Sequence, residues 1–300
     1  MKFAVFTDLH YDDIFDGEER LREFLVAVKK ENISFIVSLG DLCRPIEQNR
    51  WIAGLLKGTG IPVYFAAGNH DLACNIPEQL MDFLEITSLY HSFCCENIKF
   101  IILNACYMKA EEEIRPYHQK EHKRETDHYP LIPDFEVRWL EEEMRREDLY
   151  YIVFSHHSLI NDYGNRGVSN RAEIREILSR RKTILCMNGH DHGADCRNIQ
   201  GTFYYTLNSM SYLWHRKTEL RPYPEELYRK YAHLDHMILY QNPLYCIVDI
   251  TDGKVKIMGA KSDYRHITPE EAGIPDRKWD GVSVQPEAPD LSFSLSGACP

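Results

Sequence analysis

The stretch PVYFAAGNHD (residues 62–71) joins a run of apolar residues to a cluster of polar ones. Its first part, 62–67, has the length and composition of a buried strand. Gly68 then allows a sharp turn, and Asn69, His70 and Asp71 follow side by side. Three side chains that bind metals or transfer protons, placed directly after a strand, predict a functional site at the end of that strand.

The alternation of strand and helix extends along the chain in both directions. Strands are predicted at 2–7, 35–39, 62–67, 99–105, 150–155 and 183–188, and helices at 18–32, 49–58, 77–86, 134–147 and 170–181. Beyond residue 202 the pattern becomes β only, with strands expected at 202–209, 243–250 and 254–260 and a turn at Asp252-Gly253. This order predicts an α/β core completed by antiparallel strands.

Polar side chains stand at the ends of five of these strands. They are Asp8 and His10; Asp41; Asn69, His70 and Asp71; His156 and His157; and His190, Asp191 and His192. Ligands of such sheets gather beyond the carboxyl ends of the strands, so these residues are expected to meet at one edge. Residues two apart on an extended chain point the same way, which suits the Asp-x-His and His-x-His spacings. The glycines before Asp41, Asn69 and His190 are expected to supply turns.

The types of side chain narrow the choice of ligand. Aspartate, asparagine and histidine without cysteine suit Mn²⁺, Fe²⁺ or Fe³⁺, or Zn²⁺. Seven candidate ligands exceed what one ion normally takes. The pattern therefore predicts two ions that share a bridging carboxylate.

The motifs Asp8-Leu9-His10, Gly40-Asp41, Gly68-Asn69-His70-Asp71, His156 and Gly189-His190-Asp191-His192 occur in an order that resembles the calcineurin-like metallophosphoesterase superfamily. Within that superfamily the pattern is similar to the class III cyclic nucleotide phosphodiesterases and related phosphodiesterases. The resemblance covers about residues 1–210. Arg44 stands where purple acid phosphatases carry a metal-binding tyrosine, which disfavours that branch. The resemblance implies a four-layer α/β/β/α sandwich of two mixed β-sheets flanked by helices.

The resemblance also implies roles for individual residues. The first ion would be held by Asp8, His10, Asp41 and His192. The second would be held by Asp41, Asn69, His156 and His190, with His156 favoured over its neighbour His157. His70 would be the general acid, Asp71 would orient it, and Asn69 and His70 would also contact substrate.

The implied activity is hydrolysis of small phosphodiesters, such as cyclic nucleotides, glycerophosphodiesters or nucleotide conjugates. A metal-bridging hydroxide would attack phosphorus in line, and His70 would protonate the leaving group. The alternative is a phosphomonoesterase, acting on a protein or a nucleotide at the same site. A catalytically silent binding protein is a third hypothesis, disfavoured because every candidate ligand is present.

Composition limits the kinds of binding partner and the cellular compartment that we expect. The formal net charge of −11 disfavours long nucleic acid and leaves a small phosphate ester as the expected partner. Nine scattered cysteines without a CxxC pair suggest reduced thiols and a cytoplasmic location. We expect neither a signal peptide nor a membrane span, because no apolar run approaches 18–20 residues. The sequence does not predict an oligomeric state.

Three segments depart from the regular alternation. A single domain is expected over 1–267, with insertions at about 107–133 and 212–242 that form a lid over the metals. A proline- and acid-rich tail, 268–300, is expected to loop over the surface. Aromatic residues of the second insertion, Tyr212 and Trp214 among them, could stack on a substrate base, although packing of the insertion against the core is the preferred interpretation.

Overall fold

The computed structural model describes residues 1–73, 75–123, 126–164 and 166–295. Two six-stranded mixed sheets pack face to face, with helices on both outer sides. In the first sheet the strand order is β19 (Leu291–Ser294), β16 (Lys254–Gly259), β15 (Cys246–Thr251), β1 (Lys2–Phe6), β2 (Phe35–Ser38) and β3 (Val63–Phe65). In the second it is β11 (Asp195–Ile199), β12 (Thr202–Thr206), β10 (Thr183–Asn188), β9 (Tyr150–Ser155), β5 (Ile98–Ile102) and β4 (His91–Cys95).

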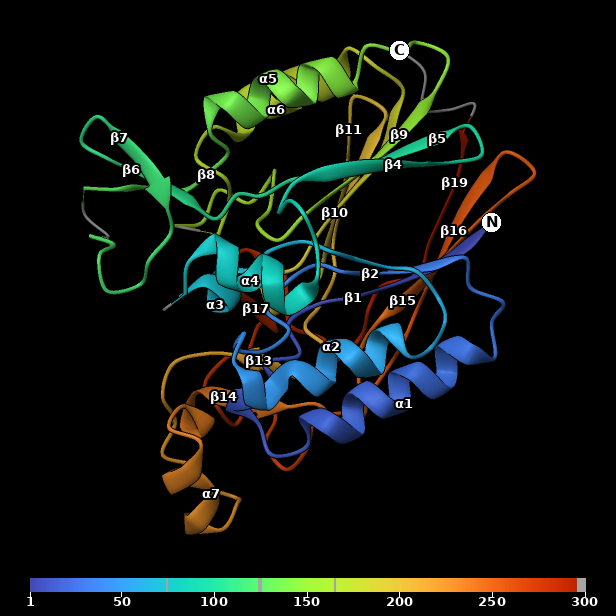
Figure 1. The fold of residues 1–300 in the computed structure, drawn as a ribbon. Helices are drawn as coiled ribbons and strands as arrows, with labels where there is room; N and C mark the ends of the chain where they lie inside the picture. Colours follow the sequence, from blue (N-terminus) through green and yellow to red (C-terminus); the bar gives the residue numbers. More distant parts are fainter. Residues whose placement is uncertain (74, 124–125, 165, 296–300) are drawn as a thin grey trace.

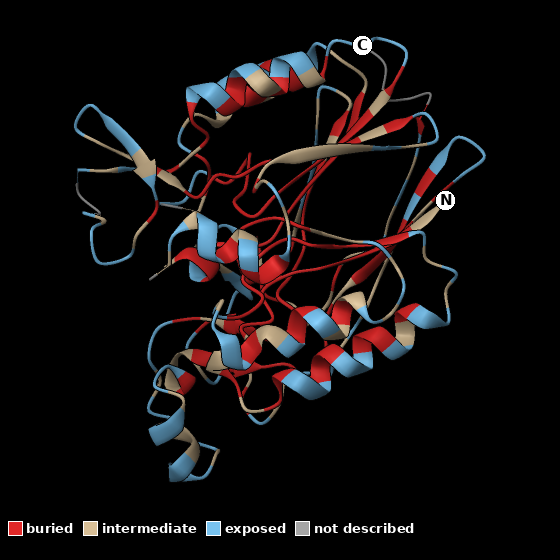
Figure 2. Ribbon diagram, in the orientation of Figure 1, coloured by how far each residue is buried: buried red, intermediate tan, exposed pale blue. Residues whose placement is uncertain are grey.

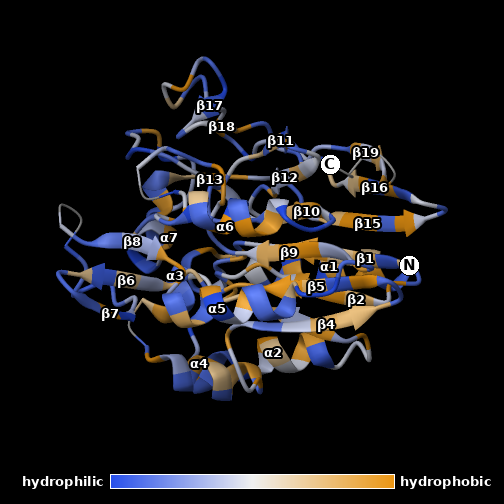
Figure 3. Cartoon of the chain, turned by 90° about the horizontal axis from the view of Figure 1, so that it is seen from above, coloured by the Kyte–Doolittle hydropathy of each residue, from blue (hydrophilic) through white to orange (hydrophobic). Residues whose placement is uncertain are grey.

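Helices cover the outer face of each sheet, so the molecule has four layers (Figure 1). Helices α1 (Gly17–Lys29), α2 (Arg50–Lys57) and α4 (Pro77–Leu84) pack on the first sheet, and α5 (Asp134–Glu143) and α6 (Arg171–Ser179) on the second. This is the α/β/β/α sandwich that the family resemblance implied. The central strands are apolar and the outward face of α5 is hydrophilic, as Figure 3 shows.

The core between the sheets is apolar and largely aromatic. Phe3 of β1 and Phe100 of β5 approach each other edge to face, with ring centroids 5.5 Å apart, and Phe3 also stacks on Phe35 of β2. All three are buried, and Figure 2 shows the buried residues concentrated where the layers meet. Burying large rings on both faces fixes the two sheets against each other, which gives the strand ends a rigid base.

Both predicted insertions contain secondary structure. The first forms a three-stranded sheet of β7 (Glu113–Pro116), β6 (Tyr107–Ala110) and β8 (His128–Leu131). The second contains β13 (Tyr212–Trp214) paired with β14 (Met237–Leu239), and the short helix α7 (Glu225–Lys230). Both lie at the end of the sandwich opposite the N-terminus, beside α3 (Asn69–Leu72) (Figure 1).

The segment beyond residue 268 is more ordered than the sequence predicted. It forms a hairpin of β17 (Lys278–Trp279) and β18 (Val282–Ser283), and then β19, which pairs antiparallel with β16 at the edge of the first sheet. The expected surface loop is therefore corrected up to residue 295. The reason is that an edge strand pairs through its backbone and requires little hydrophobic pattern in its own sequence.

Two further expectations concern membranes and thiols. Among the described residues, no helix is long and apolar enough to cross a membrane. The seven described cysteines carry free thiols, and the other two, Cys74 and Cys299, lie outside the described residues.

Candidate metal centre

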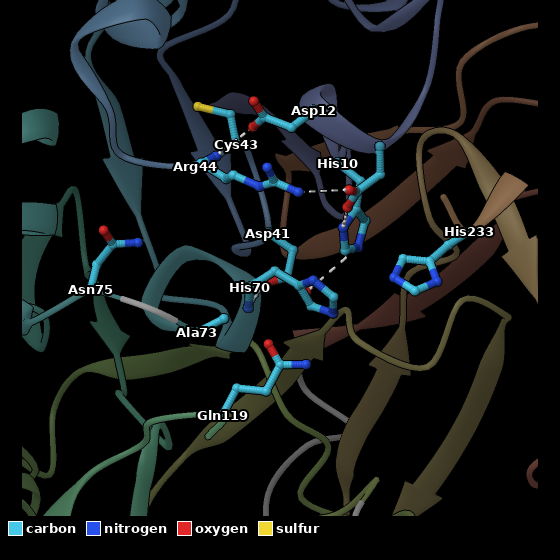
Figure 4. A pocket seen from close by; sticks show the side chains of 11 residues that line it. His10, Asp12, Asp41, Cys43, Arg44, His70, Ala73, Asn75, Gln119 and His233 are labelled. Carbon is cyan, nitrogen blue, oxygen red and sulfur yellow. Dashed lines mark hydrogen bonds and ion pairs between the residues drawn. The ribbon is translucent and has the colours of Figure 1, made fainter. Parts of the chain in front are cut away.

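The candidate ligands from five strand ends meet at one end of the sandwich. The candidate ligands form four groups, and within each group the ligand atoms lie within 4.8 Å of one another. The groups are Asp8, His10 and His192; Asp8, Asp41 and His156; His10, Asp41 and His70; and His156, His157 and His190. Asp8 and Asp41 belong to two groups each, so the clusters are contiguous. The Asp41 side chain lies beside His10 and His70 in Figure 4.

The first cluster has the spacing of a coordination shell. The Nε2 atoms of His10 and His192 are 3.2 Å apart, and they lie 3.6 and 3.4 Å from Asp8 Oδ1. Two ligands about 2.1 Å from one tetrahedral ion would be about 3.4 Å apart. Asp8 Oδ1 is buried and accepts no hydrogen bond from the described part of the chain. A cation at this point would satisfy that oxygen and both imidazole nitrogens, so the residues fit a metal ion.

The second cluster is built around His156. Its Nε2 lies 3.2 Å from Asp41 Oδ2 and 3.1 Å from Asn69 Oδ1. The ring of His190 is 5.0 Å from the ring of His156. A carboxylate, an amide oxygen and two imidazoles therefore converge here, the set expected for a second ion. Asp41 Oδ2 is also 3.5 Å from His10 Nε2, so this carboxylate lies between the two clusters.

Hydrogen bonds behind the ligands set their tautomers. His156 Nδ1 donates to the carbonyl of Leu39 at 2.8 Å, and His192 Nδ1 donates to the carbonyl of Tyr212 at 3.0 Å. Each bond places a proton on Nδ1, so Nε2, turned toward the carboxylates, is the nitrogen that can bind a metal ion once it has lost its own proton. Asp8 Oδ2 is likewise held by the Thr7 hydroxyl at 2.6 Å. The cluster is therefore oriented by groups that are not themselves ligands.

The buried charges of the cluster shift the pKa values of its histidines. Burial lowers the pKa of His10, but the carboxylates of Asp13, Asp8 and Asp41 outweigh it and raise the pKa to about 10. Burial likewise opposes the charge of His156, while Asp41 raises its pKa to about 9. In the metal-free protein these imidazoles are protonated at neutral pH. The carboxylates thus require positive charge between them, as protons or as metal ions.

The backbone around the ligands is unusual. Asp8, His10, Asp41, His190 and His192 all have left-handed φ values, between +48° and +65°. Side chains other than glycine adopt this region at a cost of about 1–2 kcal/mol per residue. Such conformations concentrate at functional sites, where surrounding contacts enforce them. These left-handed residues were not predicted, because the turns were expected at the preceding glycines.

Those glycines serve mainly to allow close approach. Only Gly40 has a positive φ, of +105°, among the three glycines that precede candidate ligands. At the other two a side chain would clash: a Cβ at Gly68 would lie 2.1 Å from Asp41 Oδ1, and a Cβ at Gly189 would lie 2.6 Å from Asp8 Oδ2. The turns themselves are made in part by the ligand residues, Asp41 among them. Gly68 and Gly189 are therefore required because neighbouring strand ends crowd together.

A family model for calcineurin-like phosphoesterases matches residues 1–194. The chain belongs to the calcineurin-like phosphoesterase family. This confirms the resemblance drawn from the motifs and supports a metal-dependent phosphoester hydrolase. Two ions are consistent with the two ligand clusters.

Solved structures share the fold of this phosphoesterase. A dimetal phosphatase from Danio rerio has a TM-score of 0.65 and 12% identity, over 98% of this chain and 99% of that one. GAP50, the anchor in the inner membrane complex of Plasmodium, has a TM-score of 0.55 and 12% identity, over 95% and 96%. No curated protein matches the sequence. At these identities the similarity establishes the fold alone.

The residues expected to act on substrate occupy different positions in this phosphoesterase. His70 is exposed, lines the cavity beside the ligands, and has its ring 4.7 Å from that of His10 (Figure 4). Tyr212 is buried, with its ring packed 4.7 Å from that of His192. Trp214 is half-buried and stacks on His236. Packing thus accounts for both aromatic residues, although both also border the cavity.

Asp71 makes contacts other than the one expected. The family resemblance implies that it orients the His70 imidazole. In the structure its Oδ2 accepts hydrogen bonds from the backbone amides of Asp41 and Gly68, both at 2.9 Å, and its Oδ1 accepts one from Leu42 at 3.0 Å. Asp71 therefore joins two strand ends through their backbones. Its position on the short helix α3 turns the carboxylate toward the preceding loop.

The cavity at the metal centre has two overlapping lobes, which share the lining residues His10, Asp13, Asp41, His70, Gln119 and His233. One lobe, of about 410 Å³, reaches Arg44 (Figure 4). The other, of about 550 Å³, reaches Arg166 and is lined by residues of both insertions, including Tyr129 and Trp214.

Three residues near the site were not predicted from the sequence. Arg166 and Asp280 line the larger lobe and pair with each other, and Tyr129 OH lies 2.9 Å from His157 Nε2. Each stands alone in the sequence with no motif around it, so no local signal could have identified it.

Proposed function

We propose that this phosphoesterase hydrolyses small phosphodiesters at a centre of two metal ions. The single observation that carries the preference for diesters is the pair of lobes that meet at His10, Asp41 and His70. A diester carries an organic group on each side of phosphorus, whereas a monoester carries one. A cavity that extends from the ligand cluster both to Arg44 and to Arg166 has room for both groups of a diester.

The residues divide the work in the proposed reaction. Asp8, His10, Asp41 and His192 would hold one ion, and Asp41, Asn69, His156 and His190 the other. Bound ions of this kind polarise the phosphoryl oxygens and supply a nucleophile at neutral pH. The identity of the ions is left open among Mn²⁺, Fe²⁺ or Fe³⁺, and Zn²⁺, all of which these ligands suit.

His70 is the proposed general acid. It is exposed in the cavity where the two lobes join, so an oxygen leaving into either lobe would be within its reach. Its backbone amide donates to Asp41 Oδ1 at 2.7 Å, which ties the position of its ring to the ligand cluster. Protonation of a poor alkoxide leaving group is where a general acid contributes most.

The proposed substrate is small, and its setting is proposed to be the cytoplasm. The net charge of −11 and a cavity of limited volume favour a small ester over long nucleic acid. The insertions are proposed to act as a lid that selects the substrate, because residues of both line the larger lobe.

The test compares two esters on one metal-restored preparation. Protein stripped with chelator and given back Mn²⁺ should hydrolyse bis(p-nitrophenyl) phosphate faster than p-nitrophenyl phosphate. Asp41→Asn should abolish activity and Mn²⁺ binding. The matched control is Asp252→Asn, since Asp252 is an exposed turn residue with a φ of +52° against +53° for Asp41. Asparagine tolerates that conformation at both positions.

The outcomes separate the hypotheses. A preference for the monoester would refute the diester proposal and select the phosphomonoesterase. Binding of Mn²⁺ without turnover of either ester or of natural diesters would select the silent binding protein. Absence of Mn²⁺ binding would refute the metal centre itself.

A further inference from the structure

The hairpin β17–β18 (residues 278–283) lies directly against the loop that carries His190 and His192. Ala194 and Ser283 exchange two backbone hydrogen bonds, of 2.7 and 2.8 Å. Between them and the ligands, Gly193 approaches the hairpin so closely that a Cβ would lie 2.4 Å from Val282 Cγ2. This hairpin is nearly ninety positions further along the chain and lies outside the region that the family model matches, 1–194.

One side chain connects the hairpin to the ligand loop. The Arg166 guanidinium donates through Nε and Nη2 to Asp280 Oδ2, at 3.1 and 2.7 Å. Through Nη1 it donates to the backbone carbonyl of His190 at 3.1 Å. The two side chains are only 17% and 21% exposed, so the pair is shielded from solvent more than an ordinary surface ion pair. The backbone of Asp280 is held in turn by Asn161 Nδ2, at 3.2 Å.

His190 needs such support because its backbone is left-handed, with a φ of +65°. Its amide donates to Asp8 Oδ2 at 3.0 Å, and its carbonyl accepts from Arg166. The peptide groups on both sides of the residue are therefore fixed, one by the ligand cluster and the other by the guanidinium. Strained conformations persist where surrounding contacts over-determine them, as they do here.

We infer that Arg166 is a positioning residue for His190, and that Asp280 of the C-terminal hairpin holds Arg166 in place for this task. The inference rests on the proposed metal centre, in which His190 is a ligand of the second ion. It makes the hairpin part of the site. Loss of either side chain should weaken binding of the second ion more than binding of the first. The contacts run from Asp280 through Arg166 to His190, a proposed ligand of the second ion, and they touch the first cluster only where the His190 amide donates to Asp8.

The experiment is calorimetric titration of Mn²⁺ into the metal-stripped full-length protein and its variants. Arg166→Ala and Asp280→Ala should each weaken one of two binding events by about 10–100-fold, the usual effect of losing an outer-shell partner. The double variant should be no weaker than Arg166→Ala alone, because both substitutions break the same connection. Arg166→Lys should fall between, since an ammonium group lacks the planar fork that serves Asp280 and His190 together.

The matched control is Asp162→Ala. Asp162 also pairs with an arginine of this region, Arg171, through a single carboxylate oxygen, yet it lines neither lobe of the cavity. It should leave both affinities unchanged. Thermal unfolding of every variant confirms folding.

Two results would count against the inference, and both can be distinguished from a result that refutes the proposed function. Wild-type affinity for both ions in folded Arg166→Ala would overturn it and reduce the pair to a stabilising contact. Additive weakening in the double variant would overturn the dependence of Arg166 on Asp280. If the unaltered protein binds no Mn²⁺, the metal centre itself fails.

Discussion

Adding one methyl group at Gly189 should disturb the metal centre by displacing Asp8, one of its candidate ligands. A Cβ there would lie 1.9 Å from Thr7 Oγ1 and 2.6 Å from Asp8 Oδ2. Real atoms do not approach so closely, so the Thr7 side chain and the Asp8 carboxylate must both move. Because the Thr7 hydroxyl donates to that same oxygen at 2.6 Å, the hydrogen bond that orients Asp8 is lost as well.

The size of the effect follows from these contacts. Overpacking a dense core costs about 1–3 kcal/mol, and the lost hydrogen bond adds about 1 kcal/mol. Unfolding entropy of about 2.1 cal/mol/K per residue, over 300 residues, makes 1 kcal/mol worth about 1.6 °C. Gly189→Ala should therefore lower Tm by about 3–6 °C. Movement of Asp8 should also weaken Mn²⁺ binding about 10–100-fold, as loss of outer-shell partners does at other metal sites.

Scanning calorimetry and Mn²⁺ titration measure the two effects. The control is Gly54→Ala in the middle of α2, where a Cβ would have no atom within 4 Å. It should stabilise the protein by about 0.5–1 kcal/mol, the cost of a helical glycine, and leave Mn²⁺ affinity unchanged. A Gly189→Ala protein with unchanged Tm and affinity would refute the reasoning. A lower Tm with normal affinity would show that only Thr7 moves.

Three further predictions concern His70 as general acid, the hydrogen bonds of Asp71 to backbone amides, and the release of protons when Mn²⁺ binds. His70→Ala should lower kcat for an alkyl phosphodiester about 10²–10⁴-fold, because the alkoxide leaving group needs a proton. It should lower kcat for a p-nitrophenyl ester much less and leave Mn²⁺ affinity intact. Equal losses on both esters would refute the general acid. Asp71→Asn should destabilise the protein by about 1–3 kcal/mol in denaturant unfolding, because one carbonyl oxygen cannot serve three backbone amides; rescue of activity by exogenous acid would instead favour a proton-transfer role. Mn²⁺ affinity should rise from pH 6 to 8, because metal must displace protons from His10 and His156, whose pKa values are raised to about 10 and about 9. Titration in buffers of different ionisation enthalpy should detect proton release, and its absence would refute these pKa shifts.

The fold was predictable where one short segment carried its own pattern. Strands such as 150–155 and 183–188 are mostly apolar and almost wholly buried, because they lie inside a sheet that is covered on both faces. Edge strands were missed for the converse reason. β11 reads DCRNI, and β4 and β19 are half-buried or exposed along most of their length. Backbone pairing and a few side chains that reach the core, such as Phe93 and Phe293, place these strands.

The candidate ligands were predictable because each stands within a few residues of a strand that the sequence marks. The arrangement around them was not. Two kinds of contact place the remaining residues at the site. Arg166 and Asp280 are joined by contacts between segments that are distant in sequence, and Asp71 is joined to the strand ends through backbone amides. Neither kind of contact leaves a recognisable pattern in the local sequence. The left-handed turns at Asp8 and Asp41 are likewise enforced by neighbouring strand ends.

The sequence by itself therefore determined the chemical identity of the candidate ligands and, through five short motifs in order, the resemblance to the family that implied the four layers. Each motif is a local run of residues, so it can be read without the tertiary structure. Only the tertiary structure decided the two-lobed cavity, the contacts of Asp71 and the connection from Asp280 through Arg166 to His190. These depend on the distances at which separate segments pack, and such distances are set by the whole core rather than by any one stretch of the chain.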